Sequence, residues 1–259
     1  MFCREYEDNL KPLLILITII FTSCQPTEQA PLSGDVSSKS QANTAASKWP
    51  DSTFPITIKF GSDFDSAEKQ ALTNATESWN QTNNNQITYF QTGLSEFSAR
   101  NTLDEFRDGE LGIYKLFNWP AEMPKTALAV TQIFGTRSSN GQIRIDHADV
   151  LLNYDYFDFS ADDSWGYDLE TVVLHELGHF LGLYHEDSSA DESVMYPTIS
   201  RYRLNRSPHI HDQDNLAIKY PSIVSRSIAS VDVMNGEEQT PVVMILELHK
   251  DGSEIRRVK

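Results

Sequence analysis

The alternation of hydrophobic and polar residues predicts a series of strands and helices between residues 49 and 222. Residues 56–60 alternate with period two, which is typical of a strand with one buried face. Capping residues at 63–66 precede apolar residues at helical spacing, so a helix is expected over about 66–80. Four apolar runs predict further strands: residues 87–91, 111–116, 127–134 and 142–153. Residues 94–110 fit either a loop or a short helix. The pattern indicates an α+β fold.

An apolar stripe predicts one further helix, which begins after Asp168. Asp168 is a favourable N-cap, and Glu170 lies in the first turn, where an acidic side chain interacts well with the helix dipole. The stripe falls on one helix face and is expected to pack against the core; its members are Leu169, Val173, Leu177 and Phe180. Gly182 then offers the left-handed conformation that commonly ends helices.

Three histidines lie on and just after this predicted helix, in the segment HELGHFLGLYH. His175 and His179 are one turn apart on nearly the same face, so both can offer a ring nitrogen to one ion. Gly182 allows the chain to turn, so that His185 can approach the ion from another side. Three neutral imidazoles leave the fourth tetrahedral position of Zn²⁺ open for water, as in catalytic sites. Glu176 lies between the first two histidines, where its carboxylate can reach that water.

A single helical histidine is more often an ordinary core or surface residue than a ligand, but the full segment matches the metzincin signature HExxHxxGxxH. Residues 193–197, SVMYP, resemble the second metzincin element, the Met-turn. Met195 alone would be an ordinary core residue; its place after the third histidine favours a position beneath the metal. Among metzincins the chain most resembles the matrixins, whose Met-turn commonly reads Met-Tyr-Pro and whose last catalytic helix is similar to residues 211–220. A looser resemblance at 141–150 extends the similarity over about 50–222.

This resemblance implies a metzincin-type zinc peptidase domain at 49–222, with a twisted, mostly parallel sheet, an active-site helix and a Met-turn. It implies a zinc-dependent endopeptidase that acts on a protein or peptide, with Glu176 as general base toward a zinc-activated water. The substrate is expected to lie along an edge strand. The candidate for this strand is Ala127, Leu128, Ala129 and Val130. An ordinary sheet strand without contact to substrate is an equally good interpretation of these residues. Tyr196 and Pro197 are expected to wall the pocket beyond the scissile bond.

Two other functions remain open. In the first alternative, the chain is a catalytically inactive binding or adhesion module that holds zinc for structure. In the second alternative, it is an enzyme that acts on something other than peptides. The open ligand position and Glu176 argue against the first alternative, and the Met-turn argues against the second.

The sequence departs from the matrixin pattern in a few places. Glu186 follows the third histidine, where matrixins usually have serine. His147 and Asp149 only partly resemble the second, structural zinc site of animal matrixins. Calcium is a further candidate cofactor, with four acidic residues as its possible ligands: Asp155, Asp158, Asp162 and Asp163. The favoured interpretation of these residues is a solvated acidic loop.

Charge and cysteine content exclude several classes of function. The chain has 37 acidic and 21 basic residues and a net charge of −16, so its field repels phosphate backbones and nucleic acid is not an expected partner. The two cysteines, Cys3 and Cys24, both lie near the N-terminus, which excludes a disulfide framework and a thiolate metal site in the body of the chain. We expect a monomer.

The N-terminal residues predict export. The apolar run at 13–21 is shorter than the roughly 20 residues that a spanning helix needs, and it fits the centre of a signal peptide over 1–23. The run ends in FTSC, which resembles the lipobox of bacterial lipoproteins and predicts lipidation of Cys24. Residues 24–48 read as a flexible tether, so the membrane is contacted only through the lipid, on the periplasmic or cell-surface side. The alternative is an ordinary cleaved signal and a secreted protein.

The C-terminal residues predict a small β-hairpin extension over 223–259. Residues 242–249 and 253–258 read as strands around an Asp-Gly turn. The sequence leaves open whether this extension is an accessory sheet, an edge for docking a partner or a disordered end. It is not needed for the zinc chemistry.

Overall fold

The computed structural model describes residues 47–82, 87–97, 100, 102–162, 166–186, 192–221, 239–250 and 257–258. The predicted signal peptide, Cys24 and residues 24–46 of the predicted tether lie outside these residues. Within the described part of the chain, no helix is long and apolar enough to cross a membrane.

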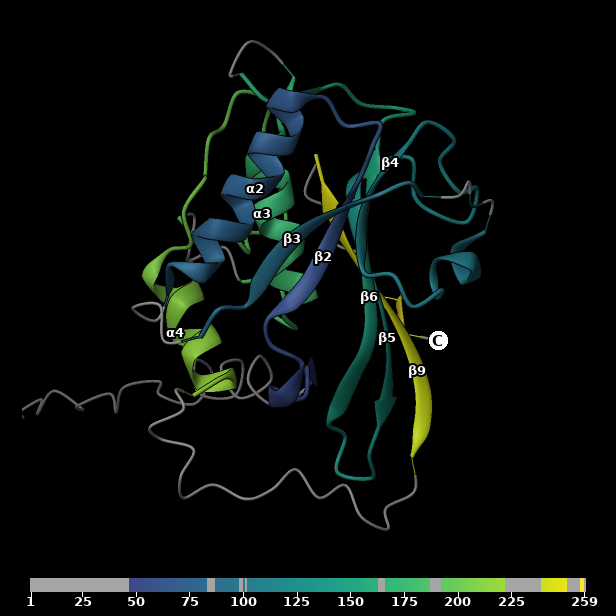
Figure 1. The fold of residues 1–259 in the computed structure, drawn as a ribbon, viewed down its shortest axis with the longest axis vertical. Coiled ribbons are helices and arrows are strands. Elements are labelled where there is room, and N and C mark those ends of the chain that lie inside the picture. Colours follow the sequence, from purple (N-terminus) through teal and green to yellow (C-terminus); the bar gives the residue numbers. More distant parts are fainter. Residues whose placement is uncertain are drawn as a thin grey trace, which may run out of the picture. The chain divides into compact units, whose positions relative to one another are not determined.

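One mixed sheet of eight strands forms the centre of the fold (Figure 1). Its order is β10-β9-β5-β6-β4-β2-β3, and β1 pairs with β6. The strands are β1 (Ser47–Lys48), β2 (Ile56–Gly61), β3 (Phe90–Ser95), β4 (Gly112–Leu116), β5 (Ala127–Arg137), β6 (Ile143–Asn153), β9 (Thr240–His249) and β10 (Arg257–Val258). Pairing is parallel from β3 to β6 and antiparallel from β6 through β5 and β9 to β10. A separate two-stranded parallel sheet contains β7 (Phe159–Ser160) and β8 (Tyr167–Asp168).

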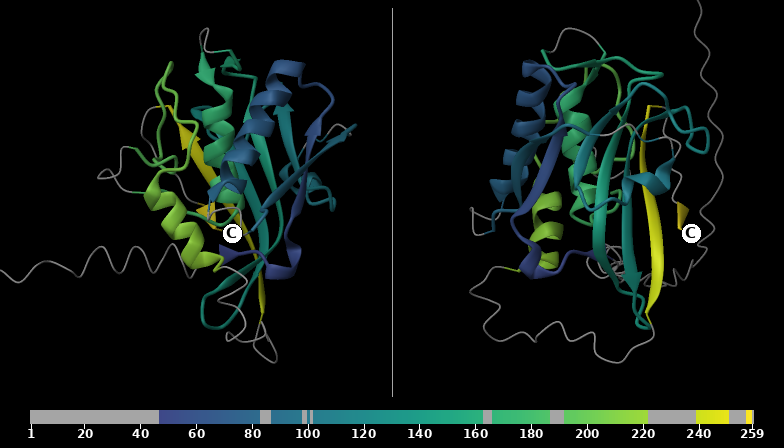
Figure 2. Two further views of the ribbon diagram at one scale, coloured as in Figure 1. Left: turned by 60° about the vertical axis from the view of Figure 1, so that its left-hand side comes forward. Right: turned by 45° about the vertical axis from the view of Figure 1, so that its right-hand side comes forward.

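Three α-helices of the described chain lie on one face of the sheet: α2 (Ser66–Asn80), α3 (Leu169–Phe180) and α4 (Ile210–Lys219) (Figure 2). Asp65 caps α2 through a capping box with Glu68, as the residues at 63–66 predicted. Trp79 of α2 is fully buried against α3, where its indole Nε1 donates to Leu174 O at 2.9 Å. The main hydrophobic core therefore lies between these helices and the sheet.

A smaller core lies on the opposite face of the sheet, beneath the segment that joins β3 to β5. It includes the 3₁₀-helix η3 (Leu103–Phe106), which resolves the ambiguous prediction at 94–110. Phe106 and Trp119 from this segment pack with Val130 of β5 and Ile245 of β9. Another 3₁₀-helix, η1 (Asp51–Thr53), lies near the start of the described chain.

The α+β assignment is confirmed, and most of its elements lie where the periodicity predicted them. The strand predicted at 87–91 is wrong in its bounds, because β3 starts only at Phe90 and continues to Ser95. The Asn80 side-chain oxygen accepts from the backbone N–H groups of Tyr89 and Phe90, both at 2.9 Å, and so fixes the turn that precedes β3. Asn80 is nine and ten positions before its two partners, and the alternation of apolar residues does not predict contacts of this kind.

The folded part of the chain begins before residue 49, so the predicted limit of the tether at 48 is wrong. Ser47 and Lys48 form β1 and pair with Ile143 and Arg144 of β6. Trp49 is buried, and its indole Nε1 donates to Phe180 O at 2.7 Å. These contacts anchor the start of the domain to the end of α3.

The C-terminal strands pair as the predicted hairpin requires, but the extension is not a separate accessory sheet. β10 pairs antiparallel with β9, and β9 pairs antiparallel with β5 along the length of both strands (Figure 1). Met244, Leu246 and Leu248 of β9 are buried in the main core. Their alternation gives β9 one apolar face, which packs on the same core as the rest of the sheet.

Candidate metal centre

Helix α3 is fixed at both ends and buried on all sides. Asp168 caps its N-terminus by accepting from Thr171 N at 2.9 Å, and it also accepts from Arg206 Nε at 3.0 Å. Gly178 lies against Met195, since a Cβ at this position would be 2.3 Å from the Met195 sulfur. The predicted Met-turn therefore packs directly against the helix, where a side chain at position 178 would displace Met195.

The chain leaves α3 through Gly182, as predicted. Gly182 has φ +87°, and a Cβ there would lie 2.4 Å from the Ser47 carbonyl oxygen, so both its conformation and its surroundings favour glycine. Its own carbonyl accepts from Lys219 Nζ at 2.9 Å, and Leu183 N donates back to Gly178 O at 2.9 Å. This reversal returns His185 toward the helix.

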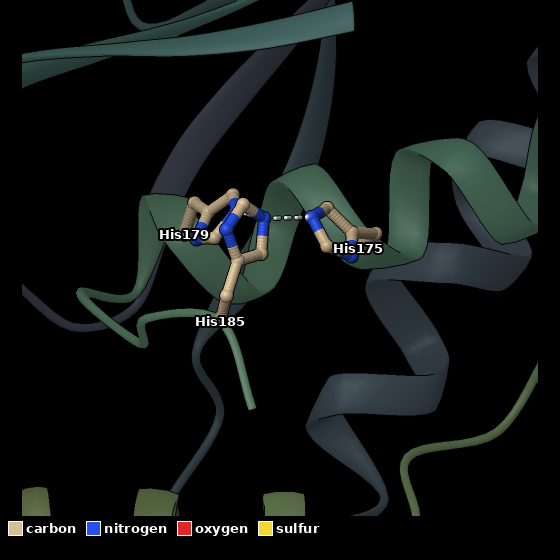
Figure 3. A group of neighbouring side chains, drawn as sticks. All are labelled: His175, His179 and His185. Atoms are coloured by element: carbon tan, nitrogen blue, oxygen red, sulfur yellow. Dashed lines mark hydrogen bonds between the residues drawn. The ribbon is translucent and has the colours of Figure 1, made fainter. Parts of the chain in front are cut away.

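The three predicted metal ligands converge on one point (Figure 3). His185 Nε2 is 3.1 Å from His175 Nε2 and 3.0 Å from His179 Nε2. A nitrogen atom from each of the three rings lies within 4.8 Å of the others. In the described part of the chain, no second group of three or more His, Cys, Asp or Glu residues meets in this way.

The hydrogen bonds of the rings leave the converging nitrogens able to bind a cation. His175 Nδ1 is 2.7 Å from Val194 O, and His179 Nδ1 is 2.8 Å from Leu183 O. A carbonyl oxygen can only accept, so each Nδ1 carries the proton and each Nε2 presents a lone pair. Burial lowers the pKa of both rings well below its usual value, which keeps them neutral.

The spacing of these nitrogens fits zinc. The lone pairs of His175 Nε2 and His179 Nε2 point toward His185 Nε2, which is 3.1 and 3.0 Å away. Tetrahedral zinc with Zn–N bonds of 2.0–2.1 Å separates its nitrogen ligands by about 3.3 Å. A ligand shift of a few tenths of an ångström therefore accommodates the ion, and the donor set matches the one that zinc prefers.

Glu176 is fully buried and held on one side only. Thr131 of β5 donates its hydroxyl to Glu176 Oε2 at 2.5 Å, whereas Oε1 has no hydrogen-bond partner among the described residues. Burial, with a smaller contribution from the charge of Glu247, raises the pKa of Glu176 to about 8 despite the opposing effect of the Thr131 hydrogen bond. Oε1 is therefore the carboxylate oxygen that no described residue engages.

Two supporting residues were not singled out from the sequence. Thr131 occurs inside a predicted strand, and nothing local marks it as a partner of Glu176. Asp212 of α4 accepts from Ser193 Oγ at 2.5 Å, Val194 N at 3.0 Å and His209 N at 2.8 Å. Since Val194 O orients His175, Asp212 positions a predicted metal ligand through the Met-turn.

Asp212→Asn is expected to weaken zinc binding by about 10- to 100-fold, the usual effect of losing a residue that orients a metal ligand. The amide removes an acceptor from the Met-turn and so loosens the carbonyl that orients His175. Zinc affinity is measured by competition with a chromogenic chelator. Asp214→Asn, an exposed position on the same helix, is the control. Equal zinc affinities for the two variants would contradict this role.

The predicted substrate-binding residues at 127–130 lie on β5, which is not an edge strand. Ala129 and Val130 pair with β6 on one side and with Leu248 and Glu247 of β9 on the other. The edge expected at 127–130 is therefore already covered in this structure. The sequence did not predict this because the strand that covers β5 is β9, which lies far away along the chain.

The role of Tyr196 and Pro197 as a pocket wall stays a prediction, but Tyr196 lies near one of the predicted metal ligands. Tyr196 lines a cavity of about 20 Å³ together with His175, Val194 and Leu248. The carbonyl oxygen of Pro197, which follows Tyr196, accepts from His249 N at 3.3 Å. The wall is therefore in contact with β9.

The predicted calcium site stays a prediction. Asp155 accepts from Trp119 N at 3.1 Å, and Asp162 accepts from Ser160 Oγ at 2.9 Å, so these carboxylates have protein donors. Asp163 lies outside the described residues.

His147 and Asp149 form a buried pair, and among the described residues they belong to no group of three or more possible metal ligands. His147 Nε2 is 2.7 Å from both Asp149 Oδ2 and Phe106 O, and Gly112 N donates to Asp149 Oδ1 at 2.9 Å. Burial lowers the pKa of His147, but the hydrogen bond and charge of Asp149 outweigh it, and the net shift is upward. Burial raises the pKa of Asp149. The pair joins β6 to β4 and η3.

His147→Phe is expected to lower the free energy of unfolding by about 3–5 kcal/mol at pH 6, because Asp149 is left buried without its partner. Both folded-state pKa values are raised, so the folded state binds protons more tightly than the unfolded state. The stabilisation by the pair is thus greatest below pH 6.5 and falls as pH rises through the raised pKa of His147. Urea unfolding at pH 6 and pH 9 measures both effects, with His147→Phe/Asp149→Asn as the rescue. A variant as stable as the wild type at pH 6 would contradict the assignment.

A model of the matrixin family matches residues 48–220. The chain belongs to the matrixin family. Relatives of this matrixin include metalloendoproteinase 2-MMP of Arabidopsis thaliana, 43% identical over 17% of this chain and 15% of the relative. Metalloendoproteinase 1-MMP of the same plant is 40% identical over 23% and 15%. Matrix metalloproteinase-9 of Canis lupus familiaris is 38% identical over 24% and 9%. The chain thus matches less than a fifth of the length of each of these relatives.

Proposed function

We propose that this matrixin is a zinc-dependent endopeptidase. The observation that carries the proposal is the convergence of three histidine Nε2 atoms from α3 and the turn after it. Glu176 of the same helix is buried, and its Oε1 has no partner among the described residues. Membership of the family supports a metalloendopeptidase, and the names of the relatives agree with that class. A protein or peptide is the proposed substrate.

Each residue has a distinct part in the proposed mechanism. His175, His179 and His185 hold one zinc ion through Nε2, and the carbonyls of Val194 and Leu183 keep two of these rings in the correct tautomer. Bound zinc supplies a Lewis acid that lowers the pKa of water toward about 7. Glu176 accepts the proton of the attacking water at Oε1 while Thr131 holds Oε2 in place. Glu176 then passes the proton to the leaving amine.

A cleavage assay tests this proposal and separates it from its rival. The purified chain is incubated with casein or a quenched peptide, with and without a chelator, and its zinc content is measured on the same sample. The proposal expects cleavage that the chelator abolishes and that added zinc restores. A zinc-loaded protein that binds peptides without cutting them would instead support the inactive binding module.

We also propose that the protein is exported and anchored by lipid at Cys24, as the lipobox-like FTSC indicates. Cys24→Ala is expected to move the protein from the membrane fraction to the soluble fraction, because the anchor is lost. Fractionation followed by mass spectrometry of the N-terminal peptide measures this. A protein that stays soluble with an unmodified Cys24 would favour the secreted alternative.

A further inference from the structure

Strand β9 lies directly between β5 and the segment that follows the Met-turn. On one side it pairs antiparallel with β5, where Leu246 lies opposite Thr131. On the other side, His249 N donates to Pro197 O and His249 O accepts from Ile199 N, both at 3.3 Å. These two contacts form a parallel bridge at Thr198. The end of β9 is therefore hydrogen bonded on both edges.

The same strand lies next to the residues of the proposed mechanism. Leu248 lines the small cavity that His175 and Tyr196 also line, and it is almost completely buried. Thr131, which pairs with Leu246, is the residue that holds Glu176. Residues 246–249 thus occupy the space beside the metal ligands and the proposed base.

Main-chain pairing of this kind is a general way for proteins to hold an extended peptide. The edge of β5 and the 197–199 segment together offer donors and acceptors to a strand between them, and Leu248 of β9 lines the cavity there. A peptide that approached Glu176 along β5 would need the hydrogen-bonding groups that β9 already uses. The two strands therefore exclude one another.

Two features indicate that β9 is separable from the peptidase domain. The family match ends at residue 220, before β9 begins. β9 also carries Glu247 and His249 into buried positions, and Glu247 Oε1 has no hydrogen-bond partner among the described residues. A buried carboxylate oxygen without a partner weakens the docking of the strand.

From these contacts we propose that Thr240–His249 is an intramolecular inhibitor that occupies the peptide groove. Peptide substrates reach Glu176 only when β9 leaves β5. The inference rests on the proposed peptidase function, because it names the segment that occupies the groove proposed for the substrate. If β9 is bound in most molecules, the apparent affinity for peptides is the intrinsic affinity multiplied by the fraction of molecules whose groove is open.

A reversible disulfide between β5 and β9 tests the inference. Gln132 and Ile245 lie opposite one another in the register, so Gln132→Cys with Ile245→Cys links the strands covalently. The full chain carries these changes together with Cys3→Ser and Cys24→Ser. A matched control, Thr136→Cys with Arg144→Cys, links β5 to β6 and leaves β9 free. Both proteins are loaded with zinc, and a phosphine reductant opens the disulfide.

Two readouts are taken on each protein: hydrolysis of a quenched peptide, and binding of a peptide hydroxamate followed by hydrogen exchange at residues 240–249. In the β5–β9 protein, reduction is expected to raise hydrolysis and hydroxamate affinity by roughly tenfold or more. The hydroxamate is expected to deprotect residues 240–249 only after reduction. The control is expected to change little.

The outcomes separate this inference from the proposed function. Equal hydroxamate affinity before and after reduction of the β5–β9 protein would overturn the inference, whatever the peptidase activity. If hydroxamate binding depends on the disulfide but neither form cleaves peptides, the groove assignment stands and the peptidase proposal fails. Deprotection of residues 240–249 in the locked protein would also overturn the inference.

Discussion

Glu176→Gln is expected to retain zinc and to lose peptide hydrolysis by about 10²- to 10⁴-fold, the usual contribution of a general base. The substitution keeps the size of the side chain, and its amide oxygen still accepts from Thr131. The amide cannot take up a proton, however, so the attacking water is no longer activated by the protein. Zinc is measured by inductively coupled plasma mass spectrometry, and hydrolysis is measured with a quenched peptide on the same sample.

Glu77→Gln is the matched control, because Glu77 is exposed on α2. It is expected to leave both zinc content and hydrolysis unchanged. Turnover near the wild-type rate in the Glu176 variant would remove this residue from the mechanism. Loss of zinc in that variant would mean that Glu176 supports the metal site instead of the chemical step.

His179→Ala is expected to prevent stoichiometric zinc binding and, with it, all chelator-sensitive hydrolysis. Its Nε2 is one of three converging donors, and the fully buried ring leaves a cavity that alanine does not fill. Two remaining imidazoles supply too few ligands for a closed or catalytic zinc site. Zinc content after dialysis measures the effect.

His211→Ala is the control for this variant, because His211 is exposed on α4 and lies outside the metal cluster. It is expected to bind one zinc ion per chain. A His179 variant that still binds one zinc ion with wild-type affinity would show that the metal is held elsewhere.

The centre of the site was predictable because its geometry is local. The histidines at 175 and 179 are one helical turn apart, the cap at Asp168 fixes where that helix begins, and Gly182 ends it. These relations depend on residue spacing along a single helix and the bend after it. The sequence therefore predicted His185 beside the other two ligands without any knowledge of the sheet.

The surroundings of the site were not predictable because they depend on contacts between distant residues. Thr131 holds Glu176 from a strand 45 positions away, and Asp212 reaches the Met-turn from α4. The alternation at 242–249 predicted a strand but not its partner. Its pairing with β5, more than a hundred residues earlier, converts an expected edge into an interior strand.

Zinc titration of the metal-free chain tests the central claim most directly. Peptide hydrolysis and bound zinc are followed together as zinc is added. The account predicts that hydrolysis rises in proportion to bound zinc and reaches its plateau at one equivalent, with no plateau in His179→Ala. Hydrolysis by the metal-free protein, or one tightly bound zinc ion with no hydrolysis of any peptide, would contradict it.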